Sequence, residues 1–272
     1  MSEIDSKFQS LREQREGALI AYVTCGDPEP DLTVDIAESL VTGGVDIIEL
    51  GIPFSDPIAD GPTIQAASMR ALRRGITPLK VLKTVHNVKE KLGVPTVVLT
   101  YFNPVYRLGL KHFCKLASEN GVDGMVIPDL PVEEAEEYER IAEANGIDTI
   151  FLAAPSTPLK RIGKIVQHTS GFLYLVSTFG VTGVRERLEG PTVKLIQQFL
   201  PYVEGRTNLA VGFGISKPQH VKAVIQAGAD GAIAGSIFVN TIQRNQANVD
   251  KMLKELKKTA RQLKAATKCR AK

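Results

Sequence analysis

The feature that most constrains the fold of this 272-residue chain is a series of short apolar runs at fairly even intervals. Each run is rich in Val, Ile or Leu and lacks strict alternation, which is typical of strands buried on both faces of a parallel sheet. Eight such runs occur, over residues 18–24, 45–51, 95–101, 122–128, 146–153, 171–177, 208–214 and 230–236.

The segments between these runs carry helical patterns with recognisable start and stop residues. In residues 77–93, for example, Thr77 is placed to cap a helix, Pro78 falls in its first turn and Gly93 ends it. Strands that alternate with helices predict a single (β/α)8 TIM-barrel domain over residues 1–272, with an extra N-terminal helix over residues 4–15. A doubly wound open sheet is the rival architecture, but no Gly-x-Gly-x-x-Gly motif follows the first run to support it.

Composition narrows the class of protein further. Hydrophobic residues make up 43% of the chain, which is enough for a large core, and no apolar run approaches the roughly 18–20 residues of a membrane helix. The polar N-terminal segment lacks the pattern of a signal peptide. The three cysteines, Cys25, Cys114 and Cys269, form no Cys-x-x-Cys pair. We therefore expect a soluble, cytoplasmic protein with reduced thiols.

The net charge of +3 is spread unevenly along the chain. Residues 251–272, the basic C-terminal tail, hold nine Lys or Arg against the single acid Glu255. Other positions in this tail recur at helical spacing, namely Met252, Leu256, Leu263 and Thr267. A final helix with one solvated, basic face is therefore favoured over nucleic-acid binding, which stays the minor alternative.

The stretch DIIELGIPFSDPIADGP, from residue 46 to residue 62, brings four carboxylates to the end of the second run. Val45, Ile47 and Glu49 should share one face of the strand. If that face is the barrel interior, burial raises the pKa of Glu49 and makes it a usable acid or base; the alternative is a glutamate that only fills a barrel layer. Asp60 follows eleven positions later, and spacing alone leaves open whether it caps the next helix or takes part in catalysis.

Other acidic residues near the strands are expected to be structural. Asp46 is expected on the outward face of its strand, and Asp129, at the end of the fourth run, is expected to cap the helix that follows. The four histidines all fall within helical segments and lack metal-ligand spacing, so no metal site is predicted. No lysine stands at a strand end, where a Schiff-base aldolase needs one.

Glycine-rich segments follow the sixth, seventh and eighth runs, where TIM barrels often bind phosphate through backbone N–H groups and a helix N-terminus. Gly214, Gly235 and Ser236 stand at such positions, and we favour a phosphate site over simple tight turns. Aromatic residues at or near the strand ends could form an apolar slot, namely Tyr22, Tyr101, Tyr174 and Phe213. The residues thus predict a small substrate with a phosphate and an apolar body, and acid/base chemistry by two carboxylates without metal or organic cofactor.

Several segments, in order along the chain, closely resemble the signatures of the tryptophan synthase alpha subunit family. They are AYVTCGDP, ELGIPFSDPIADGPTIQ, DLPVEEA, FLAAPSTP, FGVTGVR, GFGIS and GADGAIAGS. Together they span essentially the whole chain, and the second is long enough to be specific. The resemblance implies a metal-free retro-aldol cleavage of indole-3-glycerol phosphate to indole and glyceraldehyde 3-phosphate, in tryptophan biosynthesis.

The resemblance also implies roles for individual residues. Glu49 would be the acid/base group, and Asp60 would bind the indole N–H and stabilise the charge of the intermediate. Thr182 would contact Asp60 when a loop closes over the site. Main-chain groups would hold the phosphate, at Gly183, Phe213, Gly214, Gly235 and Ser236. The substrate slot would be lined by Tyr22, Ile64, Leu99 and Tyr174.

The resemblance further implies an α2β2 complex with a β subunit that carries pyridoxal phosphate, whereas this chain would need no cofactor. Asp56 and Pro57 would face that partner. Two alternatives are a stand-alone lyase that releases indole, and a non-catalytic phosphate-binding barrel that only activates its partner. The presence of both Glu49 and Asp60 argues against the second alternative.

Overall fold

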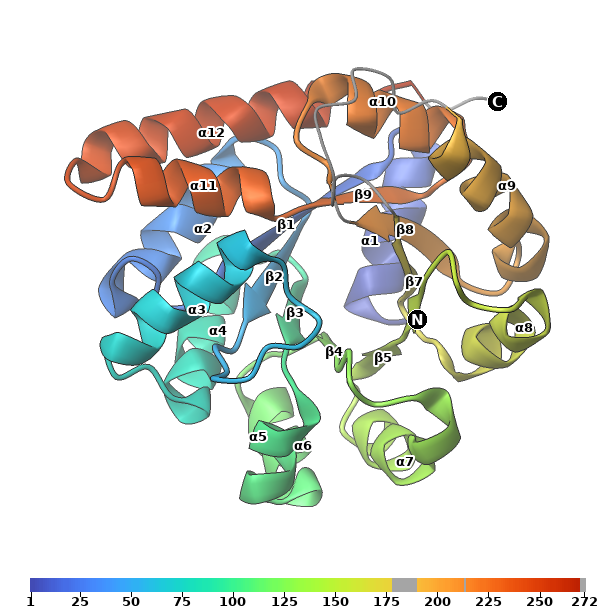
Figure 1. The fold of residues 1–272 in the computed structure, drawn as a ribbon, viewed down its shortest axis with the longest axis horizontal. Helices are drawn as coiled ribbons and strands as arrows, with labels where there is room; N and C mark the ends of the chain where they lie inside the picture. The colour runs from blue at the N-terminus through green and yellow to red at the C-terminus, as the bar shows by residue number, and fades with distance from the viewer. Residues whose placement is uncertain (178–189, 213, 270–272) are drawn as a thin grey trace.

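The computed structural model describes residues 1–177, 190–212 and 214–269. At its centre a parallel sheet curves into a barrel that helices surround (Figure 1). Within the described residues the strands are β1 (Ala18–Thr24), β2 (Ile47–Gly51), β3 (Thr96–Leu99), β4 (Gly124–Val126), β5 (Asp148–Ile150), β6 (Leu152–Ala153), β7 (Phe172–Val176), β8 (Asn208–Gly212) and β9 (Gly231–Ala234). They pair in the order β5-β4-β3-β2-β1-β9-β8-β7-β6.

All eight predicted runs form strands, and the fifth is interrupted once. β5 and β6 both come from the run 146–153, and Phe151 between them belongs to neither. β5 pairs with β4 and β6 pairs with β7, while the amide of Tyr174 donates to the carbonyl of Phe151 at 3.0 Å. The fifth run therefore joins the two edges of the sheet, and the barrel prediction is confirmed as a nearly closed ring.

Helices follow the strands where the sequence placed their start and stop residues. Thr77 caps α4 by accepting the amide hydrogen of Lys80 at 3.3 Å, and Gly93 ends that helix with a φ of 60°. The helices of the described chain are α1 (Glu3–Glu13), α2 (Thr33–Thr42), α3 (Pro62–Arg73), α4 (Pro78–Leu92), α5 (Phe102–Leu108), α6 (Leu110–Glu119), α7 (Glu136–Ala144), α8 (Leu159–His168), α9 (Pro191–Val203), α10 (Pro218–Gln226), α11 (Ser236–Arg244) and α12 (Val249–Ala265). None of them, within the described ranges, has the length and apolarity that crossing a bilayer requires.

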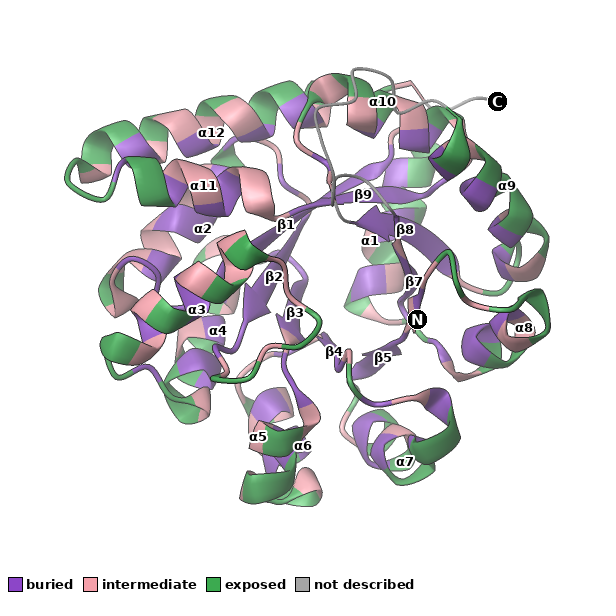
Figure 2. Cartoon of the chain, in the orientation of Figure 1, coloured by how far each residue is buried: buried purple, intermediate pink, exposed green. Residues whose placement is uncertain are grey.

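Two apolar layers hold the barrel together. The outer layer lies between the strands and the surrounding helices, whose outward faces are exposed (Figure 2). The inner layer fills the barrel itself, where Ile20, Ile47 and Val97 pack with Ile4 and Phe8 of α1. The predicted N-terminal helix is therefore confirmed, and it closes the barrel at the end where the strands begin.

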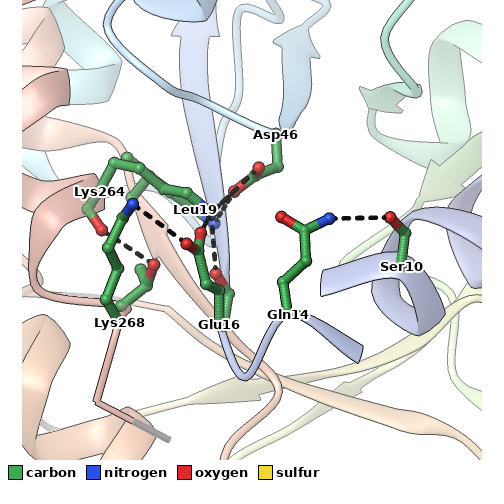
Figure 3. A network of polar contacts seen from close by, with 9 residues as sticks. Ser10, Gln14, Glu16, Leu19, Asp46, Lys264 and Lys268 are labelled. Carbon is green, nitrogen blue, oxygen red and sulfur yellow. Dashed lines mark hydrogen bonds and ion pairs between the residues drawn. The ribbon is translucent and has the colours of Figure 1, made fainter. Parts of the chain in front are cut away.

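The last helix, α12, packs against α2 as part of the helical ring. The positions predicted for its apolar face are all buried, namely Met252, Leu256, Leu263 and Thr267, although Thr267 lies just beyond the helix. At its C-terminal end Lys264 lies 2.9 Å from a carboxylate oxygen of Asp46 and 3.1 Å from one of Glu16 (Figure 3). Asp46 contacts the surrounding helix α12, as expected for an outward-facing residue, but it directly precedes β2, and its carboxylate also accepts the amide hydrogen of Leu19 at 2.7 Å.

We expect Lys264→Met to lower the free energy of unfolding by about 2 kcal/mol, because it leaves the largely buried Asp46 carboxylate without its cation. Lys268→Met is the matched control, since Lys268 pairs with Glu16 at 3.1 Å but its side chain is 60% exposed. Loss of that exposed pair should cost about 0.5 kcal/mol or less. Urea unfolding of both variants measures the difference, and equal losses would contradict this account of the network.

Candidate active site

Glu49 lies on β2 with its side chain inside the barrel, as predicted. Its lateral neighbours are Tyr22 on β1 and Val97 on β3, and Ile47 below it belongs to the inner apolar layer. Val45 differs from the prediction: it precedes the strand and packs in the outer layer. Glu49 therefore stands above the apolar filling of the barrel, toward the end where the strands terminate.

The Glu49 carboxyl is fully buried, with 0% of the residue exposed. Neither of its oxygens has a hydrogen-bond partner among the described residues. Burial, and next the negative charge of Asp60, raise the pKa of Glu49 to about 8. At neutral pH this side chain is a protonated acid without a partner, and such a group at a barrel mouth is suited to proton transfer.

Asp60 lies near the end of the segment that links β2 to α3, residues 52–61. The N-cap of α3 is Gly61, and no side chain caps this helix. The carbonyl of Asp60 instead accepts a hydrogen bond from the Gln65 side chain at 2.9 Å. The geometry therefore does not support the capping alternative, and the half-buried carboxylate of Asp60 remains available for other contacts.

Burial also raises the pKa of Asp60, to about 6, although a hydrogen bond from the Tyr101 hydroxyl acts in the opposite direction. The charges of Asp60 and Glu49 act on Tyr22 and Tyr174 as well, two buried tyrosines whose pKa values burial has already raised. The two carboxyls and the three tyrosines thus form one electrostatic cluster, with pKa values near 6 and 8 at its two acids.

The predicted slot residues lie around this cluster. Tyr22 forms a small apolar group with Ala67 and Val239, and Ile64 and Leu99 pack against it. Leu99 also packs on the inner layer, to which Tyr174 belongs. The structure therefore brings together the side chains of all four slot residues, Tyr22, Ile64, Leu99 and Tyr174.

Two glycines make space for the tyrosine rings at this mouth. A Cβ atom at Gly51, the last residue of β2, would overlap the Tyr22 ring and hydroxyl. A Cβ atom at Gly212, the last residue of β8, would overlap the Tyr174 ring in the same way. Both positions require glycine because an aromatic side chain from the adjacent strand occupies the space.

Three of the predicted phosphate-binding residues can be placed. Ser236 opens α11 after the N-cap Gly235, and no side chain caps this helix. A Cβ atom at Gly235 would lie 3.3 Å from Tyr22, so this helix N-terminus borders the slot. Gly214 has a φ of 76°, and its carbonyl lies 3.0 Å from Nδ1 of His220 on α10. Thr182, Gly183 and Phe213 lie outside the described residues.

The partner-facing prediction falls on the same β2–α3 segment. Asp56 is exposed, Pro57 is half-buried, and the apolar Ile58 that follows them is 81% exposed. Isolated apolar side chains on a surface are normal. This one lies between the predicted partner contacts and Asp60.

Sequence reasoning missed two features near the mouth and misassigned one. It named Tyr101 only as an aromatic near a strand end and gave no signal for its bond with the Ala59 amide. It also missed the two-point ion pair of Arg70 on α3 with Asp27, at 2.7 and 2.8 Å, which ties α3 to the segment after β1. Asp129 does not cap the helix after it; its carboxylate accepts the amide hydrogen of Phe102 at 2.8 Å, at the start of α5.

Within the described ranges, no group of three or more His, Cys, Asp or Glu side chains is arranged to hold a metal ion. The groups that the site does offer are two acids, an apolar slot and a helix N-terminus. These suit proton transfer on a largely apolar substrate that carries an anionic group.

Nearly the whole chain is similar in sequence to known proteins. A sequence model of the tryptophan synthase alpha chain matches residues 8–268. The tryptophan synthase alpha chain of Methanosarcina barkeri is 46% identical over 258 residues, which cover 94% of this chain and 96% of that protein. The corresponding protein of Prochlorococcus marinus (strain MIT 9313) is 47% identical over 87% of this chain and 85% of its own length.

Solved structures agree with the sequence comparison. Tryptophan synthase subunit alpha from Legionella pneumophila superimposes with a TM-score of 0.88 at 35% identity, covering 98% of both chains. A chain of the tryptophan synthase α2β2 complex from Pyrococcus furiosus superimposes with a TM-score of 0.85 at 41% identity, over 91% of this chain and 98% of its own.

Proposed function

Because this chain belongs to the tryptophan synthase alpha chain family, we propose that Glu49 and Asp60 are its catalytic carboxyls. The reaction is the lyase step of tryptophan biosynthesis that splits indole-3-glycerol phosphate into indole and glyceraldehyde 3-phosphate. The observation that carries the assignment is the Glu49 carboxyl, fully buried and without a partner among the described residues. A buried carboxyl without a hydrogen-bond partner is costly, and it is tolerated at a functional site where the bound substrate supplies the missing contacts.

The proposed mechanism begins with protonated Glu49, the form that its raised pKa favours at neutral pH. Glu49 donates its proton to C3 of the indole ring, and the positive charge that develops on the ring nitrogen is stabilised by ionised Asp60. The Glu49 carboxylate then removes the proton of the adjacent hydroxyl. The carbonyl forms, the carbon–carbon bond breaks, and its electron pair returns to the ring, so that Glu49 ends protonated as it began.

For turnover, one of the two carboxyls must therefore be ionised and the other protonated. Asp60, with a pKa of about 6, must lose its proton, and Glu49, with a pKa of about 8, must keep it. The rate kcat/KM should rise as pH increases through about 6 and fall as pH increases through about 8. This bell-shaped profile belongs to the pair, because each charge acts on the other.

Asp60→Asn tests the assignment through this profile. We expect a fall in kcat of about 10²-fold, because a neutral amide cannot balance the charge on the ring nitrogen. The acidic limb near pH 6 should disappear. The alkaline limb should move to lower pH, because loss of the Asp60 charge removes one cause of the raised Glu49 pKa. Indole release measured from pH 5 to 9 follows all three changes.

The matched control for this variant is Asp31→Asn, an exposed aspartate in the short 3-10 helix Pro30–Leu32. It should leave the rate and both limbs unchanged. An Asp60→Asn enzyme that keeps its acidic limb would show that another group titrates near pH 6, and the role proposed for Asp60 would be wrong.

We propose that the substrate phosphate binds at the N-terminus of α11. Gly235 and Ser236 present uncapped backbone N–H groups beside Tyr22, and helix N-termini favour anions. Gly214, Phe213 and Gly183 would complete this site, and Thr182 would contact Asp60 on loop closure. The indole ring would then lie among Tyr22, Ile64, Leu99 and Tyr174, with its nitrogen toward Asp60.

The partner we propose is a β subunit in an α2β2 assembly, with Asp56 and Pro57 of this chain facing it. The similar chain from Pyrococcus furiosus is part of such a complex, and the exposed Ile58 lies on the same segment. Pyridoxal phosphate would be held by that β subunit, and this chain would use no cofactor. We propose the cytoplasm as the location, a compartment in which the free cysteines of the described chain stay reduced.

A further inference from the structure

A polar link from Tyr101 ties the segment before Asp60 to the barrel mouth. This residue follows β3, and only 2% of it is exposed. Its hydroxyl accepts the amide hydrogen of Ala59 at 3.0 Å, and Ala59 directly precedes Asp60. The Tyr101 ring also packs against Phe54 of the same segment, with ring centroids 5.3 Å apart.

The Tyr101 hydroxyl can make one further hydrogen bond as a donor, and the Asp60 carboxylate can accept it. A phenol has one hydrogen to donate, and with the Ala59 amide as its donor that hydrogen is free for the Asp60 carboxylate. Burial raises the pKa of Asp60, and a hydrogen bond from Tyr101 acts in the opposite direction. The Tyr101 hydroxyl thus anchors the main chain one residue before Asp60 and has a hydrogen left for its carboxylate.

We propose that Tyr101 is a positioning residue for Asp60: its hydroxyl bridges the Ala59 amide and the Asp60 carboxylate and so holds the carboxylate over the barrel mouth as an acceptor for the substrate N–H. The inference rests on the proposed catalytic role of Asp60. It adds a residue that acts through Asp60 and joins the exposed, partner-facing part of the segment to the site.

Several titratable groups surround this bridge. Glu49 on β2, Tyr22 on β1 and Tyr174 on β7 interact with the charge of Asp60, and Asp129 after β4 interacts with Tyr101. Among these groups, Tyr101 is the hydrogen-bond donor that favours the ionised form of Asp60. Removal of the Tyr101 hydroxyl should therefore raise the pKa of Asp60, so that Asp60 keeps its proton to higher pH.

The test is Tyr101→Phe, which removes the hydroxyl and keeps the ring against Phe54. In the pH profile of indole release, the acidic limb should move to higher pH by at least about 0.5 unit. At pH 6, kcat/KM should fall about tenfold, as expected for loss of a hydrogen bond to a charged group. Tyr138→Phe is the matched control, because it removes a buried hydroxyl on α7 that bonds the Met125 carbonyl at 3.3 Å. Its acidic limb should stay in place.

A double-mutant cycle with Asp60→Asn separates this inference from the proposed function. If Tyr101 acts through Asp60, then Tyr101→Phe adds little to the loss already caused by Asp60→Asn. An unmoved limb together with additive losses would overturn the positioning role while leaving Asp60 catalytic. Full activity of Asp60→Asn alone would overturn the proposed function instead. The position of the limb does not depend on the concentration of folded enzyme, so a less stable Tyr101→Phe protein still distinguishes these outcomes.

Discussion

Glu49→Gln will lower kcat for the cleavage of indole-3-glycerol phosphate by about 10³-fold, the range expected for loss of a general acid and base. Glutamine keeps the size of the side chain and removes its transferable proton. Glu49 is fully buried above the inner apolar layer, so solvent water does not contact it and is poorly placed to supply that proton. Indole release under saturating substrate measures the change directly.

The matched control for that prediction is Glu90→Gln on α4, whose side chain is 76% exposed. It should leave kcat unchanged. Assays with and without a β subunit separate the alternatives raised by the sequence. Equal rates in both conditions would favour a stand-alone lyase. Undiminished cleavage by Glu49→Gln would contradict the proposed acid/base role and would require another proton donor.

The same substitution should change how stability depends on pH. The folded chain holds the Glu49 pKa at about 8, whereas an unfolded chain has the ordinary value near 4.5. Below pH 4.5 the carboxyl is protonated in both states and carries no penalty. As pH rises from 4.5 to 8 only the unfolded state loses this proton, so the contribution of Glu49 to wild-type stability falls by about 1.4 kcal/mol per pH unit. Above pH 8 this loss is complete.

Glutamine does not titrate, so Glu49→Gln escapes this loss. We expect the variant to gain stability relative to wild type as pH rises from 5 to 8, by several kcal/mol in total, and the gain to level off above pH 8. Urea unfolding at a series of pH values measures the difference, and Glu90→Gln should give a flat line. A difference that stays constant with pH would show that Glu49 has an ordinary pKa in the folded chain.

The barrel was predictable because its elements depend on local patterns. Apolar runs, helix caps such as Thr77 and stop glycines such as Gly93 are properties of neighbouring residues, and they marked most strands and helices closely. The inward orientation of Glu49 followed from the two-residue period of a strand that also places Ile47 inside. Periodicity could not show that β2 begins at Ile47, and for this reason Val45 was assigned to the wrong layer.

The remaining features depend on contacts between distant parts of the chain. Asp129 bonds the start of α5 because the ends of β3 and β4 lie side by side, and no local signal distinguishes this from a cap on its own helix. The pairing of Arg70 with Asp27 joins segments 43 positions apart. The bridge from Tyr101 to the segment before Asp60 spans 42 positions. Each of these contacts forms between segments that come together only in the folded barrel, so the sequence alone does not reveal it.

Two acids of this molecule lie at opposite ends of the barrel and differ in their partners. At the end where strands begin, Asp46 is neutralised by Lys264 and by a backbone amide. At the opposite end, Glu49 has no partner among the described residues. The Asp46–Lys264 pair therefore stabilises the base of the barrel, whereas the acid at the mouth lowers stability as pH rises. Selection can adjust the base for life at a higher temperature while the mouth keeps the acid proposed for its chemistry.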